Sequence, residues 1–121
     1  MRTLERYERV GQLGGSTLRL DVREEEERYL LEADLPGVNE KDIKIEVREQ
    51  HLTISAEPEK PEHKEIYLVR ERGNAYYSRR LSLPSDADPQ DVEAVYENGV
   101  LSIVVGKRPE ARPRSIEVKR A

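Results

Sequence analysis

The sequence contains no cysteine, no phenylalanine and no tryptophan, and it has a single methionine. Without cysteine the chain cannot form disulfides, thiolate zinc sites or iron–sulfur clusters, and it has no cysteine nucleophile. Its two histidines, His51 and His63, are too few for a three-histidine metal site. Tyrosine is the only aromatic residue type, so a core must be built mainly from aliphatic side chains.

Long apolar runs are absent as well. No segment approaches the roughly 20 apolar residues that span a bilayer, and residues 1–10 carry charges throughout, unlike a signal peptide. Charged residues make up 38% of the chain, and 21 basic residues are balanced by 25 acidic ones. A dedicated nucleic-acid surface should be basic overall. The 121 residues therefore predict one soluble, cytoplasmic domain that binds neither nucleic acid nor membrane.

Several local patterns mimic catalytic or metal sites without meeting their requirements. Residues 11–16 are rich in glycine, but no strand precedes them and no Gly-Lys-Ser/Thr follows, so they are no phosphate-binding loop. The acidic residues between Asp86 and Glu97 lack the central glycine and the flanking helices of a calcium loop. His51 falls in a predicted turn and His63 in a charged loop, which argues against a serine hydrolase. We expect no enzymatic activity and no cofactor.

Apolar residues recur at every second position along most of the chain. Such alternation is typical of strands with one face in a core. Only residues 49–51 separate two of these runs, which predicts an antiparallel hairpin, and Asn98-Gly99 is a strong signal for another. The positions on the predicted core faces are Leu18, Leu20 and Val22; Tyr29, Leu31, Ala33 and Leu35; Ile43, Ile45 and Val47; Leu52, Ile54 and Ala56; Tyr77, Arg79, Leu81 and Leu83; Val92, Ala94 and Tyr96; and Leu101, Ile103 and Val105.

About seven or eight short strands separated by turn signals predict an all-β protein, an immunoglobulin-like antiparallel β-sandwich. We expect three regions. Residues 1–17 form a short N-terminal arm, residues 18–106 form the sandwich, and residues 107–121 form a flexible C-terminal tail.

Two short segments between strands are predicted to form helical turns. Asn39 can cap one turn through Asp42, and Asp88 can cap another that has Pro89 at its first position. Farther along, the prolines and arginines of residues 106–115 predict an extended tether.

Two segments have no obvious place within a single sandwich. Residues 66–71 form a short apolar patch with polar flanks and nothing local to pair with, so we expect it to pair elsewhere or with another chain. Ile116 and Val118 lie on the tail, and residues spaced i, i+2 in an extended chain point the same way. They can therefore fill adjacent pockets in an apolar groove. These features are typical of a self-assembling binding protein rather than a catalyst.

Four motifs, taken together in this order and spacing, resemble the small heat-shock proteins, which are built on the α-crystallin domain. The last motif contains the hairpin residues Asn98, Gly99, Val100 and Leu101, and the tail Ile116-Glu117-Val118 is similar to the family's I-x-I/V motif. The resemblance covers residues 18–119, nearly the whole chain. The motifs are EADLPG at residues 32–37, LTISAE at 52–57, SRRLSLP at 78–84 and AVYENGVL at 94–101.

This resemblance implies an ATP-independent chaperone, a holdase, that binds partly unfolded client proteins and prevents their aggregation. It also implies a dimer that exchanges a strand between subunits, and a tail that docks on a neighbouring subunit. The implied exchange residues are Tyr67, Leu68, Val69, Arg70 and Glu71, which would pair near Leu18, Leu20 and Val22 of the partner, with Arg79 close to the interface. The implied docking residues are Ile116 and Val118, and we assign their groove to Ile43, Ile45 and Val47 together with Val92, Ala94 and Tyr96.

The sequence departs from the family in two places. The family usually has a long, phenylalanine-rich arm, whereas residues 1–17 are short and contain no phenylalanine, and Gly106-Lys107 stands where Pro-Lys is common. Two other interpretations therefore remain. One is an adaptor or co-chaperone-like sandwich that binds a single folded partner; the other is an assembly partner of a longer small heat-shock protein. The hairpin motif and the tail motif favour the holdase over the adaptor.

Overall fold

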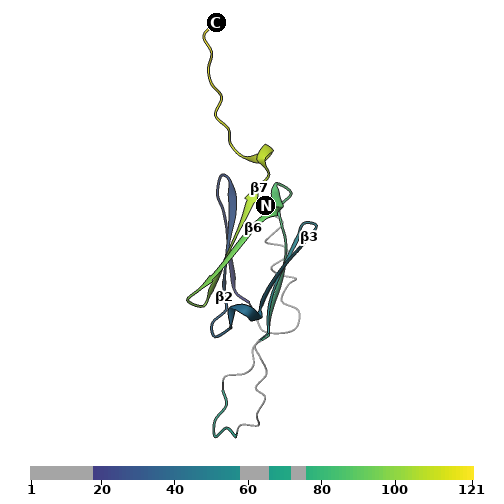
Figure 1. Ribbon diagram of the computed structural model, residues 1–121, viewed down its shortest axis with the longest axis vertical. Helices are drawn as coiled ribbons and strands as arrows, with labels where there is room; N and C mark the ends of the chain where they lie inside the picture. The colour runs from purple at the N-terminus through teal and green to yellow at the C-terminus, as the bar shows by residue number, and fades with distance from the viewer. Residues whose placement is uncertain (1–17, 58–65, 72–75) are drawn as a thin grey trace.

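The chain forms two layers of β-strands that face each other across a common core (Figure 1). This computed structural model describes residues 18–57, 66–71 and 76–121; the predicted arm at residues 1–17 and His63 lie outside them. Paired strands run antiparallel throughout, which confirms the predicted all-β sandwich.

One sheet has four strands in the order β1-β2-β7-β6, and the other has three in the order β3-β4-β5. Two short 3-10 turns accompany the strands. The elements are β1 (Leu20–Glu24), β2 (Arg28–Asp34), η1 (Glu40–Asp42), β3 (Ile43–Arg48), β4 (His51–Ala56), β5 (Tyr77–Ser82), β6 (Ala87–Glu97), β7 (Val100–Lys107) and η2 (Pro109–Ala111).

The alternating apolar residues place one face of each sheet in the core. In the four-stranded sheet Leu31 of β2 lies opposite Ile103 of β7, and both are buried. In the three-stranded sheet Ile54 of β4 and Leu81 of β5 are fully buried. Burying one such side chain contributes about 1.5–3 kcal/mol, so the period of two seen in the sequence is what holds the layers together. The largest fully buried side chains are Tyr29, Leu18, Leu31, Leu35, Leu52, Ile54, Leu81, Ile103 and Val105.

The β6–β7 hairpin forms at the predicted Asn98-Gly99 pair. Asn98 has φ of 53° and Gly99 has φ of 78°, so both turn residues adopt the left-handed backbone that a tight two-residue hairpin requires. The Gly99 carbonyl also accepts a hydrogen bond of 2.8 Å from the Leu35 backbone N–H. The hairpin turn is thereby joined to the chain that leaves β2.

The helical turn predicted through Asp42 is confirmed as the 3-10 turn η1, with Asn39 at its N-cap position. Its backbone carbonyl accepts the Asp42 N–H, but its side chain makes no capping hydrogen bond. The second predicted cap is wrong. Asp88 lies in strand β6 rather than at a helical turn. Its carboxylate does accept the Gln90 N–H at 3.0 Å, inside an irregularity where the β6–β7 register shifts between Ala87 and Val92. Pairing with β7 outweighs the local cap, and an edge strand tolerates the proline in between.

The extended tether begins later than residue 106. Gly106 pairs with Arg28, and Lys107 pairs with Ala87, so both residues belong to β7. The 3-10 turn η2 follows before the chain becomes extended. The tether was predicted to begin here from its proline and arginine content. Composition cannot reveal that β7 still pairs with β2 and β6 at this point.

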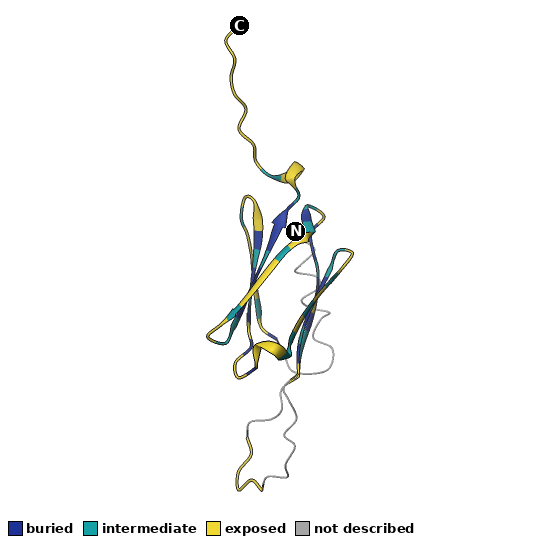
Figure 2. Ribbon diagram, viewed as in Figure 1, coloured by how far each residue is buried: buried dark blue, intermediate teal, exposed yellow. Residues whose placement is uncertain are grey.

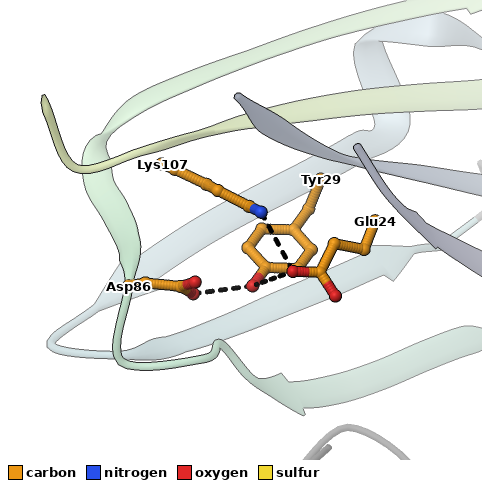
Figure 3. A network of polar contacts seen from close by, with 4 residues as sticks. All are labelled: Glu24, Tyr29, Asp86 and Lys107. Atoms are coloured by element: carbon orange, nitrogen blue, oxygen red, sulfur yellow. Dashed lines mark hydrogen bonds and ion pairs between the residues drawn. The ribbon is translucent and has the colours of Figure 1, made fainter. Parts of the chain in front are cut away.

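A polar cluster closes the end of the sandwich from which the C-terminal tail departs (Figure 3). The Tyr29 hydroxyl donates a hydrogen bond of 2.6 Å to Asp86 Oδ1 and lies 3.3 Å from Glu24 Oε2. Lys107 Nζ lies 2.9 Å from that same Glu24 oxygen and 5.2 Å from the centre of the Tyr29 ring. We call Glu24, Tyr29, Asp86 and Lys107 the end cluster. It joins β1, β2 and β7 to the segment that enters β6.

Replacing Tyr29 with Phe should lower the free energy of unfolding by about 1–2 kcal/mol, because the Asp86 carboxylate loses its short hydrogen bond in a largely buried setting. The measurement is urea unfolding followed by circular dichroism. The matched control is Tyr76→Phe, at a side chain that is 47% exposed, which should change stability by less than about 0.5 kcal/mol. Equal losses in the two variants would contradict a stabilising role for the end cluster.

Candidate functional site

The sandwich has four edge strands, and they fall into two pairs. Strands β1 and β6 end the four-stranded sheet, and β3 and β5 end the other. Arg79 of β5 is 5% exposed, and its Nη1 donates a hydrogen bond of 2.8 Å to the carbonyl of Leu18, which leads into β1. This bond places β5 and the start of β1 on one side of the sandwich. Strands β3 and β6 therefore share the opposite side.

The β3–β6 side carries the six residues that the sequence assigned to a docking groove. On β3, Ile45 lies beside the buried Ile54, and on β6, Ala94 lies beside the buried Ile103. Because these apolar residues lie on edge strands, they are less covered than the core residues. Ala94 is exposed, and the others are half-buried against the core. We call the set the β3–β6 apolar edge. It consists of Ile43, Ile45, Val47, Val92, Ala94 and Tyr96.

The opposite side is formed by β1, which pairs with β2 and with no other strand in the described part of the chain. Leu18 is fully buried just before the strand, whereas Leu20 and Val22 are partly buried against the core. One hydrogen-bonding edge of β1 is therefore open to a further strand. The residues that were predicted to receive an exchanged strand lie at this edge, together with Arg79.

At the turn that follows β1, Arg28 and Glu25 form an ion pair with 2.5 Å between Nε and Oε1. The hydrogen bond from Arg28, with the charge of its guanidinium, holds the pKa of the Glu25 carboxyl below its ordinary value. The same hydrogen bond to Glu25, with the charge of its carboxylate, raises the pKa of Arg28. Both groups face water, so the pair organises the turn without adding much to stability.

The predicted exchange segment at residues 66–71 is strongly exposed. Leu68 is 99% exposed and Ile66 is 94% exposed, values rarely seen for such large apolar side chains in a stable monomer. The segment lies beyond one end of the sandwich, away from the core (Figure 1). Arg70 stacks over the Tyr67 ring at 5.1 Å from its centre. Within a single chain these apolar groups have no core to enter.

The tail leaves from the other end of the sandwich and is exposed along its length (Figure 2). Ile116 is 76% exposed and Val118 is 92% exposed, so neither side chain packs on its own subunit. The first turn of the tail does contact the sandwich. Arg112 Nη2 lies 3.1 Å from Asp91 Oδ2, and its Nε donates a hydrogen bond to the Lys107 carbonyl. Sequence reasoning missed these contacts and the end cluster, because the Arg112–Asp91, Tyr29–Asp86 and Lys107–Glu24 contacts join residues far apart in the chain.

No group of three or more His, Asp or Glu side chains in the described residues could hold a metal ion. No helix in these residues is long and apolar enough to cross a membrane.

Residues 21–119 match the model of the Hsp20/alpha crystallin family. The chain belongs to this family. Its resemblance to the small heat-shock proteins is thereby confirmed, and membership is consistent with a chaperone role.

Related sequences come from distant organisms. Spore protein SP21 of Stigmatella aurantiaca is 41% identical over 100 residues, which cover 81% of this chain and 59% of that protein. The 18.1 kDa class I heat shock protein of Arabidopsis thaliana is 38% identical over 108 residues, covering 85% of this chain and 67% of that protein. The chain thus spans about three fifths to two thirds of the length of these relatives.

Solved structures agree with the fold. A small heat-shock protein from Xylella fastidiosa superposes with a TM-score of 0.71 at 32% identity, covering 88% of this chain and all of that one. Heat shock protein 16.0 from Schizosaccharomyces pombe gives a TM-score of 0.67 at 25% identity, covering 89% of this chain and 79% of that one.

Proposed function

We propose that the chain is an ATP-independent holdase of the cytoplasm, which binds partly unfolded proteins and keeps them from aggregating. The observation that carries the proposal is the amount of apolar surface that a single sandwich leaves uncovered. Segment 66–71 and the tail residues Ile116 and Val118 are exposed, and the β3–β6 apolar edge is only half-buried. Exposed apolar surface of this kind binds other chains by burying apolar groups, and no bond is made or broken. No catalytic step and no cofactor form part of the proposal.

The first association that we propose is strand exchange between two subunits. Residues Tyr67 to Glu71 of one subunit would pair with the open edge of β1 in its partner. Two observations support this pairing: Leu68 is exposed, and β1 has β2 as its one strand neighbour among the described residues. Backbone hydrogen bonds would supply affinity, and Arg79 beneath Leu18 would keep the receiving edge in place.

The second association is docking of the tail on the β3–β6 apolar edge of a neighbour. Ile116 and Val118 would supply two apolar side chains, each contributing about 1.5–3 kcal/mol before ordering costs. Each contact is weak, so many together would give a reversible assembly. The Xylella fastidiosa relative is reported to have a distinct high order structure.

The absence of phenylalanine and tryptophan favours a second candidate function: the chain would act as an assembly partner of a longer small heat-shock protein. The deciding experiment is light scattering from heat-aggregating citrate synthase, titrated with this protein in the absence of ATP. The holdase proposal expects suppression at near-stoichiometric ratios. If circular dichroism shows a folded protein that does not suppress aggregation alone but does so after mixing with a longer-armed relative, the assembly-partner function replaces the holdase.

Tail docking can be tested by replacing Ile116 and Val118 with Ala. We expect the assembly to shrink toward dimers while the sandwich stays folded, because the two side chains that fill the neighbour's edge are lost. The measurement is molar mass by light scattering coupled to size exclusion. The matched control is Glu117→Ala, which lies between them and points to the other side of an extended chain. Unchanged mass in the double variant would rule out docking through these residues.

Strand exchange can be tested by replacing residues 66–71 with a Gly/Ser sequence of equal length. The loop keeps its reach but loses the apolar side chains, so we expect monomers at micromolar concentration. Sedimentation velocity measures the shift, and circular dichroism confirms the fold. The tail variant Ile116→Ala/Val118→Ala serves as the control and should remain dimeric. A dimer that persists after the replacement would show that the subunits associate through another surface.

A further inference from the structure

The C-terminal extension is bonded to the sandwich before it departs. It first forms the 3-10 turn η2, in which the Ala111 N–H donates to the Arg108 carbonyl at 2.8 Å. Arg112 then reaches two strands at once: its Nε donates to the Lys107 carbonyl of β7 at 2.9 Å, and its Nη2 lies 3.1 Å from Asp91 Oδ2 of β6. We call Asp91 and Arg112 the clip. Two donors of one planar guanidinium held by two strands fix its direction as well as its position.

Gly106 makes room for the clip. A Cβ atom built on this glycine would lie 1.9 Å from Asp91 Oδ2 and 2.9 Å from Arg112 Nη2. Both atoms are at the ends of side chains that can swing away. The backbone at Gly106 is not in the left-handed region, so alanine fits the strand itself. An alanine at position 106 should therefore open the clip and leave β7 in place.

The clip is the last point at which the extension is held. Upstream, the Arg108 N–H donates to the Asp86 carbonyl at 2.7 Å, and Arg108 Nε donates to the Ser85 carbonyl at 3.1 Å. Lys107 is fixed in the end cluster (Figure 3). Downstream, every residue from Pro113 to Ala121 is exposed. The docking residue Ile116 follows shortly after Arg112, so the orientation of Arg112 decides where the tail points.

We propose that Arg112 is a positioning residue: together with Asp91, and in the space that Gly106 leaves, it sets the direction in which the docking residues leave the subunit. The inference rests on the proposed docking of Ile116 and Val118. A tail with a fixed base samples fewer directions, so it loses less entropy on docking and has a higher effective concentration at the neighbour's edge. A subunit with an open clip keeps the same docking side chains but assembles more weakly.

The direction of the tail can be measured independently of assembly. The chain has no cysteine, so Lys44→Cys and Ser115→Cys introduce the only two attachment sites for spin labels, both at exposed positions. The labelled chains also carry Ile116→Ala/Val118→Ala, so that docking on a neighbour does not fix the tail. They are diluted with unlabelled chains of the same background, and double electron–electron resonance gives the distance distribution within one subunit. We expect a narrow distribution that broadens in Gly106→Ala and Arg112→Asp but not in the matched control Arg114→Asp. A broad distribution in the parent chain overturns the proposal.

The consequence for assembly is measured by dilution, with molar mass followed by light scattering. We expect the dissociation constant of the assembly to rise roughly 1.5- to fivefold in Arg112→Asp, the range of one exposed ion pair. Arg112→Lys should have an intermediate effect, because a flexible ammonium keeps the charge but lacks the planar fork whose donors are fixed toward the carbonyl and the carboxylate. The exchanged pair Asp91→Arg/Arg112→Asp should recover only the part due to the ion pair, because a carboxylate at position 112 cannot donate to the Lys107 carbonyl. Thermal unfolding midpoints should be unchanged, which separates positioning from stability.

The two proposals fail in different ways. If Ile116→Ala/Val118→Ala leaves the mass of the assembly unchanged, docking of the tail is wrong, whatever the distance distributions show. If that variant dissociates the assembly while Arg112→Asp and Gly106→Ala broaden the distribution without weakening assembly, docking stands and the positioning role of Arg112 is overturned. A fluorescent peptide of residues 113–121 provides a further check. It should bind the Arg112→Asp and parent chains equally well, since the receiving edge is unaltered.

Discussion

The structure depends on closing one apolar core between two sheets of unequal size, four strands against three. The inner strands have neighbours on both sides, and Leu31, Ile103 and Ile54 on them are buried. Among the described residues the outer strands have one strand neighbour each, and the apolar residues of three of them, β1, β3 and β6, reach the rim of the core and remain partly open. An open backbone edge beside a half-buried apolar face is a surface that a second chain can complete. The packing that stabilises one subunit thus creates the surfaces on which association is proposed.

The polar contacts of the structure differ in strength, because buried charged groups depend more on their partners than exposed ones do. Arg79 and Lys107 are almost fully buried, and each bonds across elements that must stay together for the sandwich to exist. A buried charge left without its partner is costly, so these contacts resist opening. The side chains of Arg112 and Asp91 are 37% and 50% exposed, and water competes for both. Such a pair can hold the tail in one direction and still release it.

The sequence predicted the strands well where a single face of a strand enters the core. Leu52, Ile54 and Ala56 alternate strictly with polar residues, and every one of them is buried. It failed at Asp88, because a capping side chain is a local signal whereas the pairing of β6 with β7 is not. It also placed Arg112 on an extended tether, since composition cannot reveal a carboxylate 21 positions earlier in the chain. The exchange segment and the β3–β6 apolar edge remain predictions, because the partner in each case is another chain.

Strand β6 links the two ends of the proposed docking contact. Asp91 holds the base of the subunit's own tail, and Val92, the next residue, belongs to the edge that would receive a neighbour's tail. Neighbouring side chains on a strand point to opposite faces, so both contacts can exist together without competing for space. Under the proposed docking, one edge strand would therefore serve the tail that a subunit offers and the tail that it accepts. Undocking a tail would require withdrawing two apolar side chains from the neighbour's edge and letting the Asp91–Arg112 ion pair reorient. The core packed against β6 would remain intact. Exchange of subunits is then compatible with a sandwich that never unfolds.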